Sequence, residues 1–313
     1  ALGTVAVLMA LFAVVPGMPF LPFIIGAGGL GFASWRAIQS SKTPAVDTAE
    51  PEAAPKTKSM GDVLDFDEIH IEFAPNLVAM AFDPATGLEA RINNMRTHVA
   101  STYGLILPEI RLTDEAALPP GTYRIRLQGV ERVRDRLLPD RVLVLLADDV
   151  SAPDGIDVRE PVYGAPARWI RPDDQEDATL QGLTVVSPPE VLATHMLEVI
   201  RSNLSRLLSL RGLRRLLDEF VTLSDPIRAE ANKRLLDELI PDKVPIDLLL
   251  QVLRLLLDER VSIRNLPLIL EATAEARSLN QPEAICEHVR QRLGFQLVAE
   301  LKREDGTIPL IQL

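Results

Sequence analysis

The sequence predicts an α+β protein that starts with transmembrane segments and continues as a cytoplasmic domain of several small subdomains. Three observations predict it: Arg36 is the first charged residue, residues 37–60 are mostly small, polar or proline, and the remainder mixes strand-like and helix-like apolar spacing. The expected parts are transmembrane segments at 1–35, a flexible linker at 36–66, α/β subdomains at 67–150 with an inserted sandwich at about 81–130, a mainly helical subdomain at 151–229, and a C-terminal helical and α/β subdomain at 230–313.

Composition excludes several classes of protein. At about 150 residues per domain, 313 residues suggest about two domains, and 47% hydrophobic residues can build cores. A formal net charge of −11 and only 4% aromatic residues argue against a nucleic-acid partner. The single cysteine, Cys286, cannot form an internal disulfide or, with four scattered histidines, a zinc site. We therefore expect no metal or cofactor and a cytosolic setting for most of the chain.

The uncharged first 35 residues match the composition that a bilayer core requires. One straight helix of this length would run about 50 Å, well beyond a hydrocarbon core of about 30 Å. The prolines within Pro16–Pro22 break it, since each removes a backbone donor. We expect Ala1–Val15 to end one transmembrane helix and Phe23–Trp35 to form most of another, with a single kinked span as the alternative.

The residues that follow the apolar block indicate its orientation. Trp35 is placed as an interfacial aromatic, and Arg36 and Lys42 precede the first acid, Asp47, so the positive-inside rule puts residues after about 36 in the cytoplasm. A signal peptide is disfavoured because the block is too long and lacks a basic start. Since the first residue is Ala1, we expect an earlier part of the membrane domain to precede it.

The first soluble segment predicts a small α/β sandwich. Ile69, Ile71 and Phe73 alternate with polar residues as in a strand, a second short apolar run covers Leu77–Phe82, and helical spacing runs from Leu88 to near Gly104. Further strands are expected at Glu109–Leu112, Tyr123–Leu127 and Val142–Leu146. This order suggests a ferredoxin-like sandwich, although the aromatic motif of an RNA-recognition domain is missing.

The second half predicts mostly helices. An acidic loop is expected at Asp173–Asp177, and Ser187-Pro188-Pro189-Glu190 is a capping box that starts a helix. Further amphipathic helices are expected at Arg211–Leu223, Pro226–Leu239, Pro245–Glu259, Leu266–Ser278 and Pro282–Leu293. The last residues, Phe295–Leu301 and Thr307–Gln312, alternate in polarity and are expected to pair as strands.

Candidate catalytic residues are few. His195 lies on the apolar stripe of its predicted helix, which favours a structural imidazole over a catalytic base. Cys286 and His288 are two apart on a helix, so they point to different faces. Acid clusters such as Asp173-Asp174 lack a calcium-loop pattern and are interpreted as solvated loops. The arginines between Arg124 and Arg141 favour ion pairing at domain or subunit contacts over nucleic-acid binding.

Four blocks of sequence carry a resemblance. They are Pro16–Phe23 (PGMPFLPF), Pro161–Ile170 (PVYGAPARWI), Val191–Glu198 (VLATHMLE) and Val261–Glu271 (VSIRNLPLILE). In this order they resemble the FlhA family, the export-gate proteins of flagellar type III secretion, which have an injectisome counterpart. The Val261–Glu271 block is closer to the flagellar branch, so the injectisome role is kept as the alternative.

The resemblance implies a membrane domain in the bacterial inner membrane, a linker, and a cytoplasmic domain that assembles into a nonameric ring below the export channel. The ring would dock export chaperones with bound substrates, other export-gate membrane proteins and the associated ATPase complex, and the chain itself would not be an enzyme. Two alternatives of other classes are a membrane-tethered enzyme that uses His195 or His288 and a membrane-anchored RNA-binding regulator.

The resemblance also implies a hydrophobic dimple for chaperones, formed by two loops. The matched positions are Thr102, Gly104, Leu105 and Pro108, then Gln128, Gly129 and Val130. Thr102 stands where the family pattern has an acid and Leu105 where it has an aromatic, so an apolar contact is kept and a charged contact is lost.

The linker is expected to reach a neighbouring copy. A flexible tether of about 20 residues has an r.m.s. reach of roughly 25 Å. We therefore expect Val63, Leu64 and Phe66 to dock on the adjacent subunit of a ring.

Overall fold

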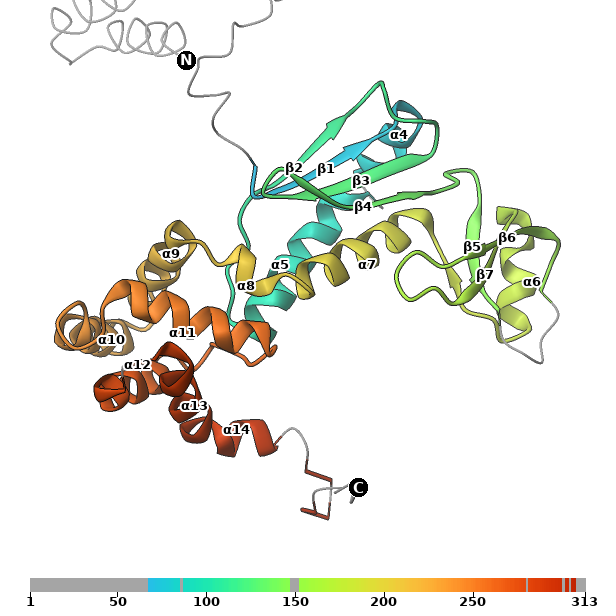
Figure 1. Ribbon diagram of the computed structural model, residues 1–313. Coiled ribbons are helices and arrows are strands. Elements are labelled where there is room, and N and C mark those ends of the chain that lie inside the picture. The colour runs from blue at the N-terminus through green and yellow to red at the C-terminus, as the bar shows by residue number, and fades with distance from the viewer. Residues whose placement is uncertain are drawn as a thin grey trace, which may run out of the picture. The chain divides into compact units, whose positions relative to one another are not determined.

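Figure 1 shows a computed structural model of the chain. The structure describes residues 67–84, 87–146, 152–279, 281–299, 302–303 and 305–307. All of them belong to one unit, Leu64–Leu313. The predicted transmembrane segments at 1–35 and the predicted linker at 36–66, with Val63, Leu64 and Phe66, lie outside the described residues. Within the described part, no helix combines the length and the hydropathy that a bilayer crossing requires.

The first sheet has four strands in the order β2-β1-β3-β4. Its strands are β1 (Ile69–Phe73), β2 (Ile110–Asp114), β3 (Thr122–Leu127) and β4 (Val130–Arg136). β1 pairs with β2 in parallel and with β3 antiparallel, and β4 pairs antiparallel with β3. The parallel pair needs a crossover, which is supplied by η1 (Pro75–Leu77), α4 (Val78–Ala81) and α5 (Leu88–Tyr103).

Two expectations for this region change. The apolar run Leu77–Phe82 forms the short helical segment that ends η1 and forms α4. The ferredoxin-like topology is wrong, because it requires a second helix after β3, whereas Gln128 and Gly129 join β3 directly to β4 in a two-residue hairpin. The sheet also includes β1 and all of β4, so it extends beyond residues 81–130 on both sides.

A second antiparallel sheet has the strand order β6-β7-β5-β8. Its strands are β5 (Val142–Leu145), β6 (Gly155–Arg159), β7 (Pro166–Ile170) and β8 (Val185–Val186), and α6 (Gln175–Leu180) precedes β8. The expected acidic loop at Asp173–Asp177 is therefore wrong: it forms η2 (Pro172–Asp174) and the start of α6. Ala178 of α6 is buried in a small core with Val144 and Ile170, which explains why the segment is helical.

The remaining elements are helices. They are α7 (Pro188–Arg201), α8 (Leu204–Leu207), α9 (Leu210–Val221), α10 (Pro226–Leu239), α11 (Ile246–Asp258), α12 (Leu266–Glu275), η3 (Ala276–Ser278), α13 (Pro282–Arg292) and α14 (Gly294–Ala299). Five predicted helices after α8 are thus confirmed to within two residues, η3 continuing α12. The predicted strand at Phe295–Leu301 is wrong, because α14 continues from α13 through the bonds that Gln296 N and Leu297 N donate to Leu293 O.

The capping box before α7 is confirmed. The Glu190 carboxylate accepts hydrogen bonds from the Ser187 amide at 2.9 Å and the Ser187 hydroxyl at 2.8 Å. Backbone donors at a helix start otherwise lack partners, so this arrangement fixes where α7 begins.

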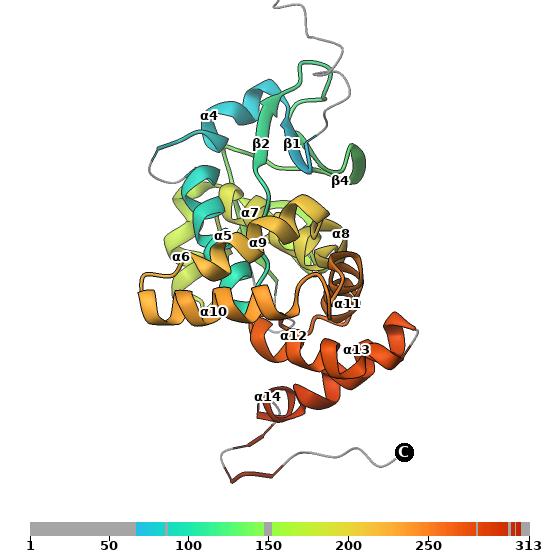
Figure 2. The same cartoon turned by 90° about the vertical axis from the view of Figure 1, so that its left-hand side faces the viewer.

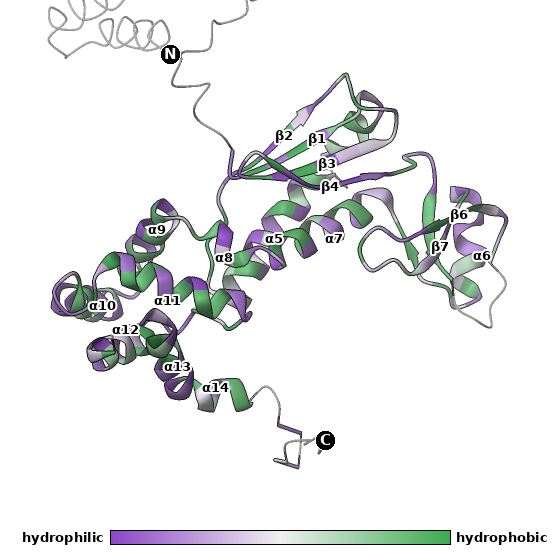
Figure 3. Ribbon diagram, viewed as in Figure 1, coloured by the Kyte–Doolittle hydropathy of each residue, from purple (hydrophilic) through white to green (hydrophobic). Residues whose placement is uncertain are grey.

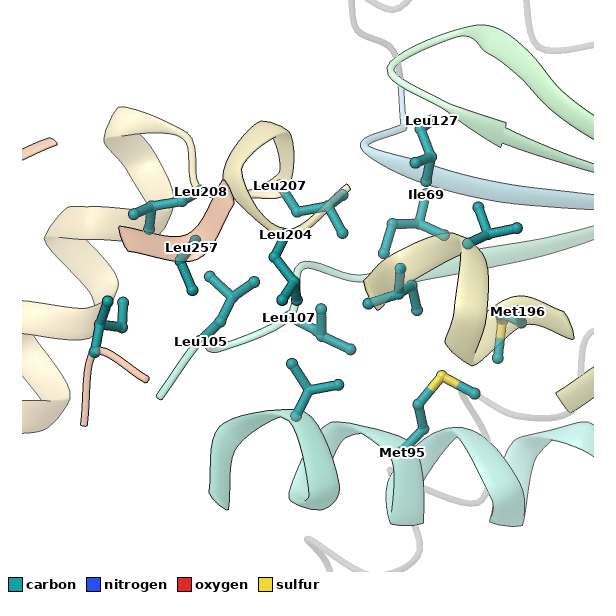
Figure 4. Close-up of a cluster of buried hydrophobic side chains, with 14 of the residues drawn as sticks. Ile69, Met95, Leu105, Leu107, Leu127, Met196, Leu204, Leu207, Leu208 and Leu257 are labelled. Carbon is teal, nitrogen blue, oxygen red and sulfur yellow. The ribbon is translucent and has the colours of Figure 1, made fainter. Parts of the chain in front are cut away.

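One large apolar core joins the first sheet to the helices. Ile69 and Leu127 from the sheet, Leu105 from the segment after α5, and Leu204 and Leu257 from α8 and α11 all belong to it. Figure 4 shows these side chains gathered around α8. In Figure 3, apolar and polar residues alternate along α11, as expected of a helix with one buried face.

Candidate docking surfaces

The first predicted docking segment follows α5. Gly104 ends this helix with φ of 78°, a left-handed conformation that glycine adopts without cost. A Cβ added there would lie 2.7 Å from Arg264 N, so the segment also approaches the loop before α12 closely. The Tyr103 carbonyl accepts a 2.8 Å hydrogen bond from Ile263 N. The end of α5 is therefore held rigidly against the helical part.

The residues of this segment differ in exposure. Thr102 is exposed and Pro108 is half-buried, whereas Leu105 is only 1% exposed and packs in the core. Leu105 therefore supports the surface from behind, and a docked protein could not contact its side chain directly. Thr102 lines a cleft of 1140 Å³ between the end of α5 and the helices α9, α10 and α14.

The second predicted segment is the hairpin turn between β3 and β4. Gln128 and Gly129 have φ of 51° and 77°, the pair of positive values that a tight turn matching the twist of its strands requires. Gln128 Nε2 donates to Arg206 O at 2.9 Å, which ties the turn to α8. Val130 is 55% exposed. The turn therefore presents the apolar Val130 side chain to solvent from a fixed position.

The structure relates the two segments through α8. Leu204 and Leu207 of this short helix lie in the core beside Leu105, while Arg206 holds the turn. The two predicted segments are therefore fixed to the same helix.

An exposed aromatic side chain was missed in the sequence analysis. Tyr163, in the turn between β6 and β7, is 71% exposed. The Glu160 carboxylate accepts hydrogen bonds from Val162 N at 2.9 Å and Tyr163 N at 2.7 Å, and Gly164 has φ of 71°. A rigid turn that presents an aromatic ring to solvent is typical of a binding surface. The available signal was an aromatic residue beside glycine in a chain with 4% aromatics.

His195 has a structural environment. Its Nδ1 lies 2.6 Å from the Tyr123 hydroxyl, and both side chains are buried. Burial lowers the pKa of His195 and raises the pKa of Tyr123. A neutral imidazole paired with a neutral hydroxyl ties α7 to β3, which is the structural role that the sequence favoured.

The other candidates for chemistry are also dispersed. Burial raises the pKa of the Cys286 thiol to about 11, which leaves it protonated at neutral pH. His288 Nε2 contacts Glu275 Oε2 at 3.1 Å near the surface. Among the described residues, no group of three or more histidine, cysteine or acidic side chains could hold a metal ion.

The arginines of β3 and β4 form ion pairs inside the first sheet. Arg124 pairs with the buried Glu72, Arg126 Nε lies 3.3 Å from the same carboxylate, and Arg134 pairs with Glu131 at 2.8 Å. Ion pairing is therefore present, but within the first sheet: between β1 and β3 for Glu72 and along β4 for Arg134. These pairs stabilise the polar face of the sheet.

The described part of the chain thus combines two four-stranded sheets with a helical part, and two of its turns present Val130 and Tyr163 to solvent. The sequence matches the FHIPEP family over residues 1–313, and the chain belongs to that family.

Relatives of the chain are flagellar biosynthesis proteins named FlhA. The one from Caulobacter vibrioides is 36% identical over all of this chain and 45% of that protein. Those from Escherichia coli and Bacillus subtilis are 32% and 30% identical, over 92% and 91% of this chain and 42% of each relative. The chain thus spans less than half the length of these relatives.

Solved structures share the fold. The Chlamydia pneumoniae CdsV protein superimposes with a TM-score of 0.63 at 20% identity, covering 78% of this chain and 70% of CdsV. Nonameric EPEC SctV-C gives a TM-score of 0.54 at 18% identity, covering 77% of this chain and 69% of that one. Both confirm a mixed helix and sheet architecture.

Proposed function

We propose that this chain is part of an export-gate protein of a flagellar type III secretion apparatus and that it works by binding. Its membership of the FHIPEP family over the whole chain, with FlhA relatives at 30–36% identity, carries the proposal. The relatives compared above are flagellar, whereas the injectisome structures share only 18–20% identity, so the flagellar role is favoured over the injectisome role.

The proposed setting is the bacterial inner membrane, with residues 1–35 in the bilayer and residues after about 36 in the cytoplasm. The uncharged block before Arg36 supports it. The cytoplasmic part would form a nine-membered ring, by analogy with the nonameric EPEC SctV-C assembly that shares the fold. Other export-gate membrane proteins and the associated ATPase complex would be its neighbours.

The ring would dock export chaperones with their bound substrates. The predicted segments offer Thr102 and Val130 to solvent, and the β6–β7 turn adds Tyr163. Tyr163 is aromatic, 71% exposed and held on a hydrogen-bonded turn, whereas Val130 is 55% exposed. We therefore place the main chaperone contact at Tyr163 and a secondary contact at Val130. Gly104 and Leu105 would support docking at Thr102 indirectly, because they hold the end of α5 in place.

Replacement of the two exposed side chains tests chaperone docking. Tyr163→Ala should weaken chaperone–cargo binding by roughly tenfold or more, since buried interface aromatics contribute about 2 kcal/mol. Val130→Asp should weaken it less. Leu180 is an apolar residue that is 80% exposed outside these turns, so Leu180→Ala is the matched control and should bind normally. Affinity is measured by calorimetry with purified chaperone–substrate complexes. Export is measured by the motility of strains that carry the same variants.

The outcomes separate the ideas. A large loss with Tyr163→Ala and a smaller one with Val130→Asp would support both contacts. Loss with Tyr163→Ala alone places the contact on the β6–β7 turn, and loss with Val130→Asp alone places it on the segments predicted from the sequence. Normal affinity for both variants would refute chaperone docking on these surfaces. Normal motility of a strain that lacks the protein would refute the flagellar role itself.

The linker contact stays a separate proposal. We propose that Val63, Leu64 and Phe66 pack on the adjacent subunit, supported by their apolar character within a proline-rich, polar segment. Cysteines at these positions should crosslink to a neighbouring copy in the assembled ring. Crosslinks found only within one subunit would contradict the contact.

A further inference from the structure

The outer edge of β2 has unused backbone hydrogen-bonding groups. β2 pairs only with β1, in parallel, and Glu115 N donates to Phe73 O at 2.8 Å. In a parallel ladder alternate residues bond to the neighbouring strand. Arg111, Thr113 and Glu115 therefore face β1, and the amides and carbonyls of Ile110, Leu112 and Asp114 point outward. In the described residues, no backbone bond uses these outward groups.

A groove runs along this free edge. It has a volume of 840 Å³ and is bounded by β2 on one side, by α5 on another, and by Phe82 after α4. Figure 2 shows β2 between β1 and α4, with α5 beside it. Ile92 of α5 and Leu112 of β2 line the groove, and the Phe82 ring is 47% exposed. The space beside the edge is therefore partly apolar and open to solvent.

The groove is also basic relative to the rest of the chain. Arg96, Arg111 and Arg215 line it against Glu89 and Glu109, whereas the whole chain has a formal net charge of −11. Arg111 also pairs with Asp67 at 3.3 Å. Arg96 Nε is buried without a hydrogen-bond partner. A buried guanidinium nitrogen of this kind is stabilised by an incoming acceptor, most strongly by a carboxylate.

We propose that this groove binds an extended segment of a partner protein, added as a further strand along β2, with apolar and acidic residues on the side that faces α5. Its backbone pairs with the outward groups of Ile110, Leu112 and Asp114 over about 17 Å, the length of five strand residues. Apolar side chains on the α5 side meet Ile92 and Phe82. An acidic side chain on the same side, two residues along the segment, meets Arg96, which lies one turn after Ile92 on α5. This site is separate from the turns assigned to chaperone docking.

A defined peptide tests the proposal. The probe is a fluorescein-labelled, eight-residue peptide in which threonine alternates with valine and glutamate in turn, so that valine and glutamate share one side. It is added to the full chain in a neutral detergent. We expect saturable binding by fluorescence anisotropy, weakened about tenfold by Arg96→Met and by replacing the glutamates with lysines. Arg132→Met, at an exposed arginine of β4 outside the groove, is the matched control and should leave the affinity unchanged.

Hydrogen exchange identifies the mode of binding. The peptide should slow exchange of the Ile110, Leu112 and Asp114 amides at least tenfold, and should leave the Arg111 and Thr113 amides unchanged because they already lie in the ladder. N-methylation of alternate peptide residues should abolish binding without any change to the protein. Leu112→Pro, which removes an outward amide that the ladder does not use, should do the same.

Three results would overturn the proposal. The first is binding that survives N-methylation of the peptide in both alternations. The second is protection of all β2 amides alike or of none. The third is a Leu112 amide that is protected before any peptide is added, which would mean that another part of the protein already covers the edge.

Discussion

Replacing Gly104 with alanine measures how tightly the end of α5 is held. The left-handed backbone, with φ of 78°, costs a residue with a side chain about 1–2 kcal/mol. The new methyl group would also lie 2.7 Å from Arg264 N, and such overpacking costs a further 1–3 kcal/mol or so. The free energy of unfolding should therefore fall by about 3 kcal/mol.

Gly129 provides the matched control. Its φ of 77° is nearly the same, but nothing lies within 4 Å of an added Cβ. Gly129→Ala should therefore lose only the backbone part, about 1–2 kcal/mol. Urea unfolding, monitored by circular dichroism, gives the free energy of unfolding of each variant. The two free energies are compared where the dependence of unfolding on urea concentration is the same for both variants. If the two variants lose the same stability within about 0.5 kcal/mol, the close approach to Arg264 has no energetic consequence and the reasoning fails.

Three further outcomes are expected. The pKa of Glu190 is lowered, chiefly by the hydrogen bond from the Ser187 amide. The ionised carboxylate therefore stabilises the folded state fully above the unfolded pKa of about 4.3, and this stabilisation is lost as pH falls through the lower folded pKa. Glu190→Gln should reduce the loss of stability with falling pH, measured as urea midpoints from about pH 6 to 3. Tyr123→Phe should cost about 1–3 kcal/mol in urea unfolding because it leaves His195 Nδ1 buried without its partner, and adding His195→Leu should recover part of this. His195→Gln should leave motility intact, whereas loss of motility in a variant that still folds would revive a catalytic role.

Helix positions were predictable where local chemistry decides them. α10 begins at Pro226 because Asp225 accepts hydrogen bonds from the Ile227 and Arg228 amides, and that capping pattern is visible in the sequence. α14 was mispredicted because a six-residue apolar alternation fits a strand as well as a helix, and its packing after Leu293 is not a local property.

The second sheet was largely missed for a physical reason. β6 is an edge strand in which Val158 alone is partly buried, and its apolar alternation is limited to Ile156 and Val158, which is too short to indicate a strand. β4 was likewise interpreted as a basic stretch, because most of its side chains are solvent-exposed and charged. Strands that contribute little to a core leave a weak signal, and pairing with neighbours decides their structure.

The exposure of the predicted docking residues could not be predicted from the sequence. The resemblance suggested Leu105 and Val130 alike, and only the structure distinguishes the first side chain, 1% exposed, from the second, 55% exposed. Tyr163 was quoted as part of a motif without a role, because exposure depends on how the Glu160 turn folds. The groove beside β2 combines residues from α5, β2 and α9, so no local pattern could indicate it.

The place of β1 within its sheet has a mechanical consequence. β1 is an inner strand, and Glu68 just before it accepts hydrogen bonds from Gln128 N and from Ser209 Oγ, both at 3.0 Å. Tension applied at Asp67 along the strand would therefore load the ladders on both sides of β1 in shear, and many hydrogen bonds would have to yield together. A body tethered in this way can be pulled from its N-terminal side without peeling open.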